Sequence, residues 1–183
     1  SKDHVTIATP MLKKYGYKGT FYPIVNRVPK TANDKKLTWD ELKQMAEDGH
    51  EIGNHSMRHY QLTKAKNRDA LEDEIISPIA IIEEKVGVKP VTFCYPGGAR
   101  NDEIIKLAES CHVGSTKGRR YFYGAETFDL HKQAQWLDKD IKAGKAHVAM
   151  LHGIVPNAGG WKPFKDAETF ENALRNIEKR END

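Results

Sequence analysis

The chain has 183 residues, enough for one domain with a substantial core, and 30% of them are charged. No apolar run approaches the length of a membrane span, and a net charge of +3 with scattered basic pairs gives nucleic-acid binding no support. Cys94 and Cys111 have neither C-x-x-C spacing nor the density of a disulfide scaffold, so we expect buried free thiols.

Helices and strands are predicted to alternate along the first half of the chain. Thr38 and Glu41 form a capping box that opens a short helix, and Pro78 should kink the longest helix or begin a new first turn there. In chain order the predicted elements are a helix over residues 5–15, a strand over 19–25, a helix over 39–46, a strand at 51–52 and a helix over 68–86.

The same alternation continues in the second half. Its predicted elements are a strand over residues 90–94, a turn over 95–98, a helix capped by Asn101 or Asp102, a strand over 112–114, a helix over 128–143, a strand over 147–151 and a helix over 168–181. This order favours a parallel α/β architecture, and both an open doubly wound sheet and a closed or distorted (β/α) barrel fit it.

Chemically suggestive residues follow the predicted strands. His55 and His59 are four apart, so they share a face if the segment is helical, and a tight turn would also bring them together. Two imidazoles can bind one transition metal and leave positions for a carboxylate and water. The turn at residues 95–98 and His152 also follow strands, and active sites of parallel α/β folds gather at these strand ends.

These segments, in this order, resemble the NodB-type polysaccharide deacetylases of carbohydrate esterase family 4. The resemblance rests on residues 12–22 (LKKYGYKGTFY), 49–59 (GHEIGNHSMRH, with the family's H-[ST]-x-x-H motif), 93–98 (FCYPGG) and 151–153 (LHG). It implies one deacetylase domain over residues 1–183, with the distorted (β/α) barrel of that family.

The chain also departs from the family pattern. The family's T-F-D-D-G motif supplies the catalytic base and a carboxylate ligand, and the chain begins just past its usual place; Asp3 is the nearest alternative. Cys94 stands where the family usually has an arginine, and the aspartate that tunes the catalytic histidine has only Asp129 and Asp138 as candidates. We therefore expect a domain incomplete at both ends that lacks the first and last strands of the barrel.

The resemblance implies a metal-dependent hydrolase that removes acetyl groups from an N-acetylated or O-acetylated polysaccharide or oligosaccharide. The expected cofactor is Zn²⁺, with Ni²⁺ or Co²⁺ as alternatives. The implied site consists of His55 and His59 as metal ligands, Gly97 at the oxyanion, His152 as the acid that protonates the amine, Leu151 as a wall of the acetyl pocket, and Tyr95 and Trp161 against the sugar rings.

Several alternatives stay open at this point. A non-catalytic carbohydrate-binding domain on the same fold, or a different metal hydrolase with its other ligands upstream, would also retain these motifs. Tyr95 and Trp161 could serve the core, and His152 could be a buried histidine at a strand end. The family resemblance favours an extracellular, periplasmic or cell-envelope location, although no segment of the given chain has the layout of a signal peptide.

Overall fold

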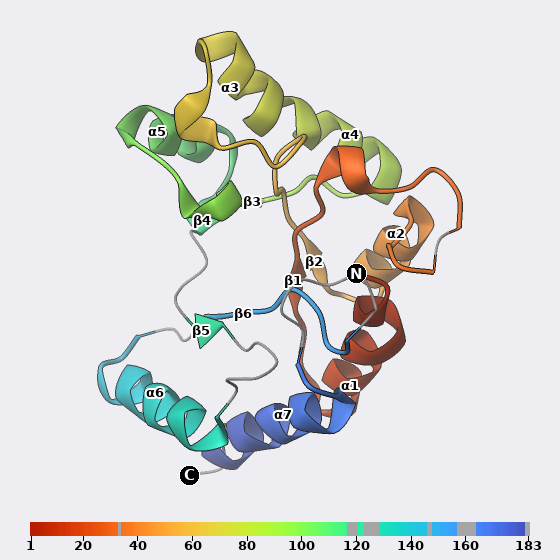
Figure 1. Ribbon diagram of the computed structural model, residues 1–183, viewed down its shortest axis with the longest axis vertical. Coiled ribbons are helices and arrows are strands. Elements are labelled where there is room, and N and C mark those ends of the chain that lie inside the picture. The colour runs from red at the N-terminus through yellow and green to blue at the C-terminus, as the bar shows by residue number, and fades with distance from the viewer. Residues whose placement is uncertain (33, 117–120, 123–128, 146–147, 157–163, 182–183) are drawn as a thin grey trace. The chain divides into compact units, whose positions relative to one another are not determined.

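The computed structural model describes the chain except for residues 33, 117–120, 123–128, 146–147, 157–163 and 182–183. The chain divides into two compact units (Figure 1). Unit 1 comprises Ser1–Tyr17, Asp34–Lys36 and Arg119–Asp183, and unit 2 comprises Lys18–Asn33 and Leu37–Gly118. The expectation of one domain over residues 1–183 stays a prediction.

The strands of unit 2 pair in parallel. β1 (Thr20–Phe21) pairs with β2 (Glu51–Ile52), and β3 (Thr92–Cys94) pairs with β4 (Gly114–Thr116). A parallel bridge between Asn54 and Phe93 continues the ladder from the end of β2 to β3. The carboxyl end of β2 is therefore held directly against β3, and this is where the histidine motif begins.

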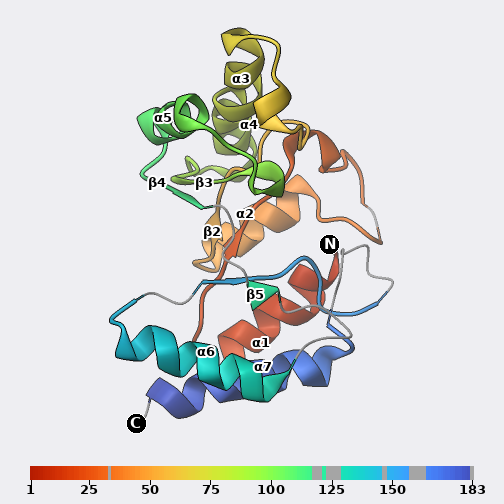
Figure 2. The ribbon, with the colours of Figure 1, turned by 60° about the vertical axis from the view of Figure 1, so that its left-hand side comes forward.

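Helices cover β3 and pack a core against it. In Figure 2, α3, α4 and α5 lie above β3 and β4. Phe93 is fully buried among Leu71 and Ile75 of α3 and Ile104 and Leu107 of α5. The helices of unit 2 are α2 (Trp39–Glu47), α3 (Arg68–Ile75), α4 (Ser77–Val86) and α5 (Asp102–Cys111), with short 3₁₀ turns at Val25–Arg27, Leu62–Lys64 and Pro96–Gly98.

The predicted helix boundaries of unit 2 agree with the structure where a cap defines them. Thr38 and Glu41 form the predicted capping box, and Asn101 rather than Asp102 caps α5 by accepting from the Ile104 N–H. The predicted helix over residues 68–86 is two helices, because Pro78 stands in the first turn of α4. Residue 87, a glycine with φ +89°, ends α4 as predicted.

Two predicted strands of unit 2 were wrong in extent. The expected strand over residues 19–25 is confined to β1, where Thr20 is exposed and Phe21 is half-buried. Pro23 cannot donate to a ladder, and a 3₁₀ turn begins at Val25. The strand expected at residues 112–114 lies two residues later as β4, and Val113 before it is 90% exposed.

Unit 1 packs three helices around a core of its own. The helices are α1 (Thr9–Lys14), which a π-helical turn at His4–Ala8 precedes, α6 (Leu130–Lys142) and α7 (Ala167–Glu181), and the parallel strands are β5 (Tyr121–Phe122) and β6 (Ala149–Met150). Phe164 and Phe170 are the large buried rings of this core. Within the described residues, no helix is long and apolar enough to span a bilayer.

Candidate functional site

The histidine motif folds as a tight turn after β2, not as a helix. Ser56 and His59 both have left-handed backbone, with φ +69° and +64°, which L-residues rarely adopt. The turn brings the rings of His55 and His59 together, with centroids 4.8 Å apart and planes at 80°. The structure thus decides between the two arrangements that the sequence left open.

The chemistry of the two rings fits a divalent metal ion. The Nδ1 atom of His55 lies 2.8 Å from the carbonyl oxygen of Cys94; since a carbonyl only accepts, Nδ1 carries the hydrogen and Nε2 the lone pair. Burial, followed by the positive charge of Arg27, lowers the pKa of His59 and favours the neutral ring that binds metals. Among the described residues, no group of three or more His, Cys, Asp or Glu side chains could hold a metal.

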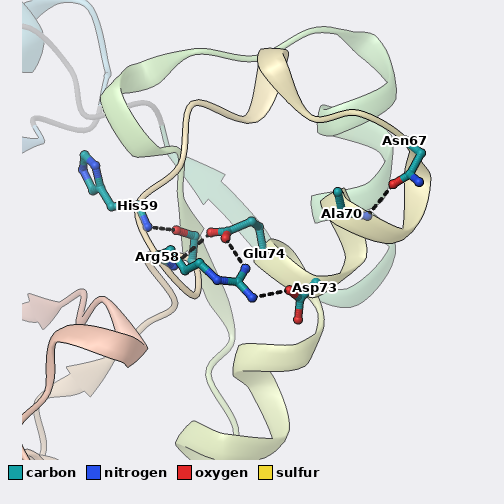
Figure 3. Close-up of polar contacts among 7 residues, drawn as sticks. Arg58, His59, Asn67, Ala70, Asp73 and Glu74 are labelled. Atoms are coloured by element: carbon teal, nitrogen blue, oxygen red, sulfur yellow. Dashed lines mark hydrogen bonds and ion pairs between the residues drawn. The ribbon is translucent and has the colours of Figure 1, made fainter.

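An ion pair from α3 holds the turn in place. The buried Glu74 carboxylate accepts the Arg58 N–H at 3.0 Å and the Arg58 guanidinium at 2.6 Å, while Asp73 accepts the other arm of the guanidinium at 2.5 Å. The His59 N–H donates to the Ser56 hydroxyl at 2.9 Å. Figure 3 shows the His59 ring pointing away from this ion-paired cluster, so the cluster fixes the backbone and leaves the ring on the other side.

The predicted oxyanion turn follows β3. Gly97 has φ +60°, and among the described residues no atom beyond its two chain neighbours lies within 4 Å of the position that a Cβ would occupy. The Arg100 guanidinium donates to the Gly98 carbonyl at 2.9 Å and steadies the turn. Burial raises the pKa of the Cys94 thiol to about 11, as expected of an inert thiol; Cys111 is also free but only half-buried.

Tyr95 lies in the core of unit 2. Its side chain is 3% exposed, packs edge-on against Phe93 at 5.2 Å, and donates its hydroxyl hydrogen to Ser115 at 3.0 Å. The Arg100 guanidinium lies over the ring, 5.6 Å from its centroid. This is the core role that the sequence left open for Tyr95, and stacking on a sugar stays a prediction.

The remaining predicted site residues belong to unit 1. Leu151 and His152 directly follow β6, and both are half-buried. Burial is the main cause that lowers the pKa of His4 to about 4, and the backbone of His152 acts in the opposite direction. Trp161 lies outside the described residues. The catalytic roles of His152 and Leu151 stay predictions.

Asp3, considered as a substitute base, is committed to a structural contact. It is 1% exposed, and one carboxylate oxygen accepts the backbone N–H groups of Ile154 and Val155. The carboxylate therefore orders the segment after His152.

Sequence comparison identifies relatives of this chain. The sequence model described as polysaccharide deacetylase matches residues 2–114. The uncharacterized protein YlxY of Bacillus subtilis is 29% identical over 152 residues, which cover 81% of this chain and 44% of that protein. A peptidoglycan-N-acetylglucosamine deacetylase of Bacillus cereus is 32% identical over 99 residues, covering 54% of this chain and 42% of that protein. The chain thus spans less than half the length of these curated relatives.

Solved structures show the same fold. The peptidoglycan deacetylase PdaC of Bacillus subtilis aligns over 98% of this chain and 79% of its own, with TM-score 0.63 and 20% identity. A mutant of BA3943, described as a CE4 family pseudoenzyme, aligns over 98% of this chain and 59% of its own, with TM-score 0.62 and 18% identity. Since the sequence model covers more than half of its residues, the chain belongs to the polysaccharide deacetylase family, the NodB-type deacetylases of carbohydrate esterase family 4.

Proposed function

We propose that this chain carries part of the active site of a metal-dependent hydrolase that removes acetyl groups from an acetylated polysaccharide or oligosaccharide. The observation that carries the proposal is the convergence of His55 and His59 in a turn at the carboxyl end of β2. Family membership supports the same reaction, and relatives named as peptidoglycan deacetylases favour an N-acetylated glycan of the cell envelope.

His55 and His59 would hold the cation, for which Zn²⁺ is the first choice and Ni²⁺ or Co²⁺ are alternatives. A bound divalent cation supplies a Lewis acid for the acetyl carbonyl and lowers the pKa of bound water. The Cys94 carbonyl keeps the His55 ring in the tautomer that presents Nε2, as outer-shell acceptors do in metal sites generally.

The other residues act on the acetyl group and the leaving amine. The backbone N–H near Gly97 would donate to the oxyanion, where the missing Cβ leaves room for the substrate. His152 would protonate the departing amine, and Leu151 would close the pocket around the methyl group. Trp161 is the proposed sugar contact, whereas Tyr95 packs in the core of unit 2. The proposal includes a distorted (β/α) barrel as the frame that carries these residues.

Metal content and acetate release test the proposal together. The wild-type protein with its native N-terminus should retain about one metal ion per chain by elemental analysis and release acetate from N-acetylglucosamine oligomers. His55→Ala and His59→Ala should each lose both properties. The matched control is His131→Ala on α6, an exposed histidine that contacts Gln135, and it should keep both.

Two results would contradict the proposal. Equal metal content in the wild type and both site variants would remove the histidine pair from the metal site. Bound metal without acetate release from any acetylated glycan would favour the alternative, a non-catalytic carbohydrate-binding domain on the same fold.

A further inference from the structure

Asn54, the residue before the histidine turn, has a buried side-chain amide with three polar contacts. It is 0% exposed. Its Nδ2 donates to the Ile75 carbonyl at 2.8 Å and lies 3.2 Å from Nε2 of His112, and its Oδ1 accepts the Ser56 N–H at 2.9 Å. A buried amide held from three directions has one orientation, because any rotation leaves a donor or acceptor unpaired.

The direction of each hydrogen bond in the series Ser56–Asn54–His112–Ala108 is fixed, because the group at one end can only donate and the group at the other end can only accept. The Ser56 N–H can only donate, so Oδ1 of Asn54 must face it and Nδ2 must face His112. At the other end, the Ala108 carbonyl can only accept, and it lies 3.0 Å from Nδ1 of His112. His112 is therefore the neutral tautomer with hydrogen on Nδ1, and its Nε2 accepts from Asn54.

The surroundings of His112 support this neutral form. The imidazole is 6% exposed, packs at 5.3 Å from the Phe93 ring and contacts the Cys111 thiol at 3.2 Å. Burial is the main cause that lowers its pKa, and the nearby charge of Lys89 acts in the same direction. A protonated ring would direct a second N–H at the Asn54 amide, which has no acceptor on that side.

Asn54 connects this buried histidine to both members of the metal-binding pair. Through Oδ1 it fixes Ser56, whose hydroxyl accepts the His59 N–H at 2.9 Å. Through its backbone it accepts the Cys94 N–H at 2.9 Å, and the Cys94 carbonyl accepts from the His55 ring. Both imidazoles of the pair thus depend on the position of one asparagine.

We propose that His112 is a positioning residue for the metal site, which acts by orienting Asn54 so that the turn holds His55 and His59 at metal-binding separation. The inference rests on the proposed function, since it assigns a role toward the metal. His112 follows α5, 53 residues beyond His59 in the chain numbering.

The chain offers a matched control in His50. This histidine is also 6% exposed, its pKa is also lowered mainly by burial, and its Nδ1 accepts a backbone N–H, that of Gly19, at 3.1 Å. Its ring packs edge-on against Phe21 at 5.4 Å. His50→Phe and His112→Phe therefore each replace a buried acceptor beside an aromatic ring. Only His112→Phe also removes the hydrogen bond to Asn54.

The experiment measures Zn²⁺ affinity by calorimetry and backbone amide hydrogen exchange on the full chain. His112→Phe should weaken Zn²⁺ binding by about tenfold, as loss of an outer-shell partner does, and should speed exchange at Ser56 and His59. His50→Phe should change neither quantity by more than about twofold. His112→Gln should restore both, because a glutamine oxygen can accept from Asn54 at the reach of Nε2.

Each outcome decides the inference. Wild-type affinity and exchange in His112→Phe would overturn it, as would equal losses in His50→Phe, which would indicate general destabilisation. If His112→Phe does not fold, His112→Asn replaces it, since a shorter side chain keeps the contact near Nδ1 and cannot reach Asn54. A wild type that binds no Zn²⁺ would contradict the proposed function. In that case, amide hydrogen exchange at Ser56 would by itself decide whether His112 positions the turn.

Discussion

Gly53, two positions before the histidine turn, lies in a tightly packed part of unit 2. A Cβ on this residue would lie 2.4 Å from Cε1 of the Tyr22 ring and 2.9 Å from the Thr92 hydroxyl oxygen. Its φ is not in the left-handed region, so the requirement for glycine comes from contact and not from backbone conformation. The Tyr22 hydroxyl and Thr92 Oγ1 are 2.9 Å apart, and the Tyr22 ring lies 6.4 Å from that of His55.

Gly53→Ala should lower the free energy of unfolding by about 2 kcal/mol, because the Tyr22 ring must move and lose its hydrogen bond to Thr92. Gly114→Ala is the matched control: it is also a strand-region glycine without positive φ, and its Cβ would lie 3.9 Å from the nearest atom, in Thr92. Urea denaturation measures both. Equal stability of the two variants would mean that the Tyr22 ring is not held over Gly53.

The sequence predicts the residues of the site only where the signal is local. His55 and His59 are recognisable because both proposed metal ligands lie in one short motif. Glu74 and His112 were missed: they lie 15 and 53 residues beyond His59, within or after amphipathic helices whose apolar stripes predict burial but not a buried polar partner. The one available signal for Glu74 was its place between Leu71 and Ile75 on the buried face of α3.

At the scale of elements, α2 begins with a complete capping box. The Thr38 hydroxyl accepts the Glu41 N–H at 3.3 Å, and the Glu41 carboxylate accepts the Thr38 N–H at 2.9 Å. Leu42 and Met45 bury the inner face of the helix, so fraying of its first turn would disturb the core. Caps of this kind were predictable because donor and acceptor lie three residues apart.

Thr38→Ala should therefore destabilise the protein by about 1 kcal/mol, the usual effect of losing an N-cap side chain. Thr38→Ser keeps the hydroxyl and should retain most of the stability. Thermal unfolding followed by circular dichroism distinguishes the two. The prediction fails if alanine and serine give the same melting temperature.

Strands were predicted less well than helices for a physical reason. A strand of two or three residues is defined by its partner, and the partners here lie far along the chain: Thr20 pairs with Glu51, and Thr92 pairs with Gly114. The alternating pattern therefore predicted parallel pairing correctly, whereas the bounds of β1 and β4 depended on contacts that no local pattern records. The break between α3 and α4 was foreseen as one of two outcomes, since Pro78 is itself a local signal.

At the scale of the whole molecule, the two units have separate cores, one around Phe93 and the other around Phe164. Composition and periodicity predicted a parallel α/β chain but did not distinguish an open sheet from a barrel. The family resemblance favoured the barrel. The comparisons confirm the family, and the barrel stays a prediction. Strand order is a long-range property, and a motif of known context predicts it better than hydrophobic periodicity does.

The buried histidines of unit 2 also predict how stability changes with pH. Burial lowers the pKa of His50 and of His112 below the ordinary value of 6.5. As pH falls through about 6.5, the unfolded chain binds protons at these rings before the folded protein does, so the free energy of unfolding decreases. The stabilisation is complete above that pH and is lost progressively down to the folded pKa values, by about 1.4 kcal/mol for each unit of difference.

Urea denaturation at pH 7.5 and pH 5.5, in the presence of a chelator, measures this loss. The wild type should be less stable at pH 5.5, and the double variant His50→Asn/His112→Gln should lose clearly less, because the asparagine oxygen can replace Nδ1 of His50 and the glutamine oxygen Nε2 of His112 as an acceptor that does not titrate. His59, whose pKa is also lowered by burial, is present in both proteins and cancels in the comparison. An equal decrease in the two proteins would mean that other groups cause the acid sensitivity, and that the two buried rings do not hold their neutral form against protonation.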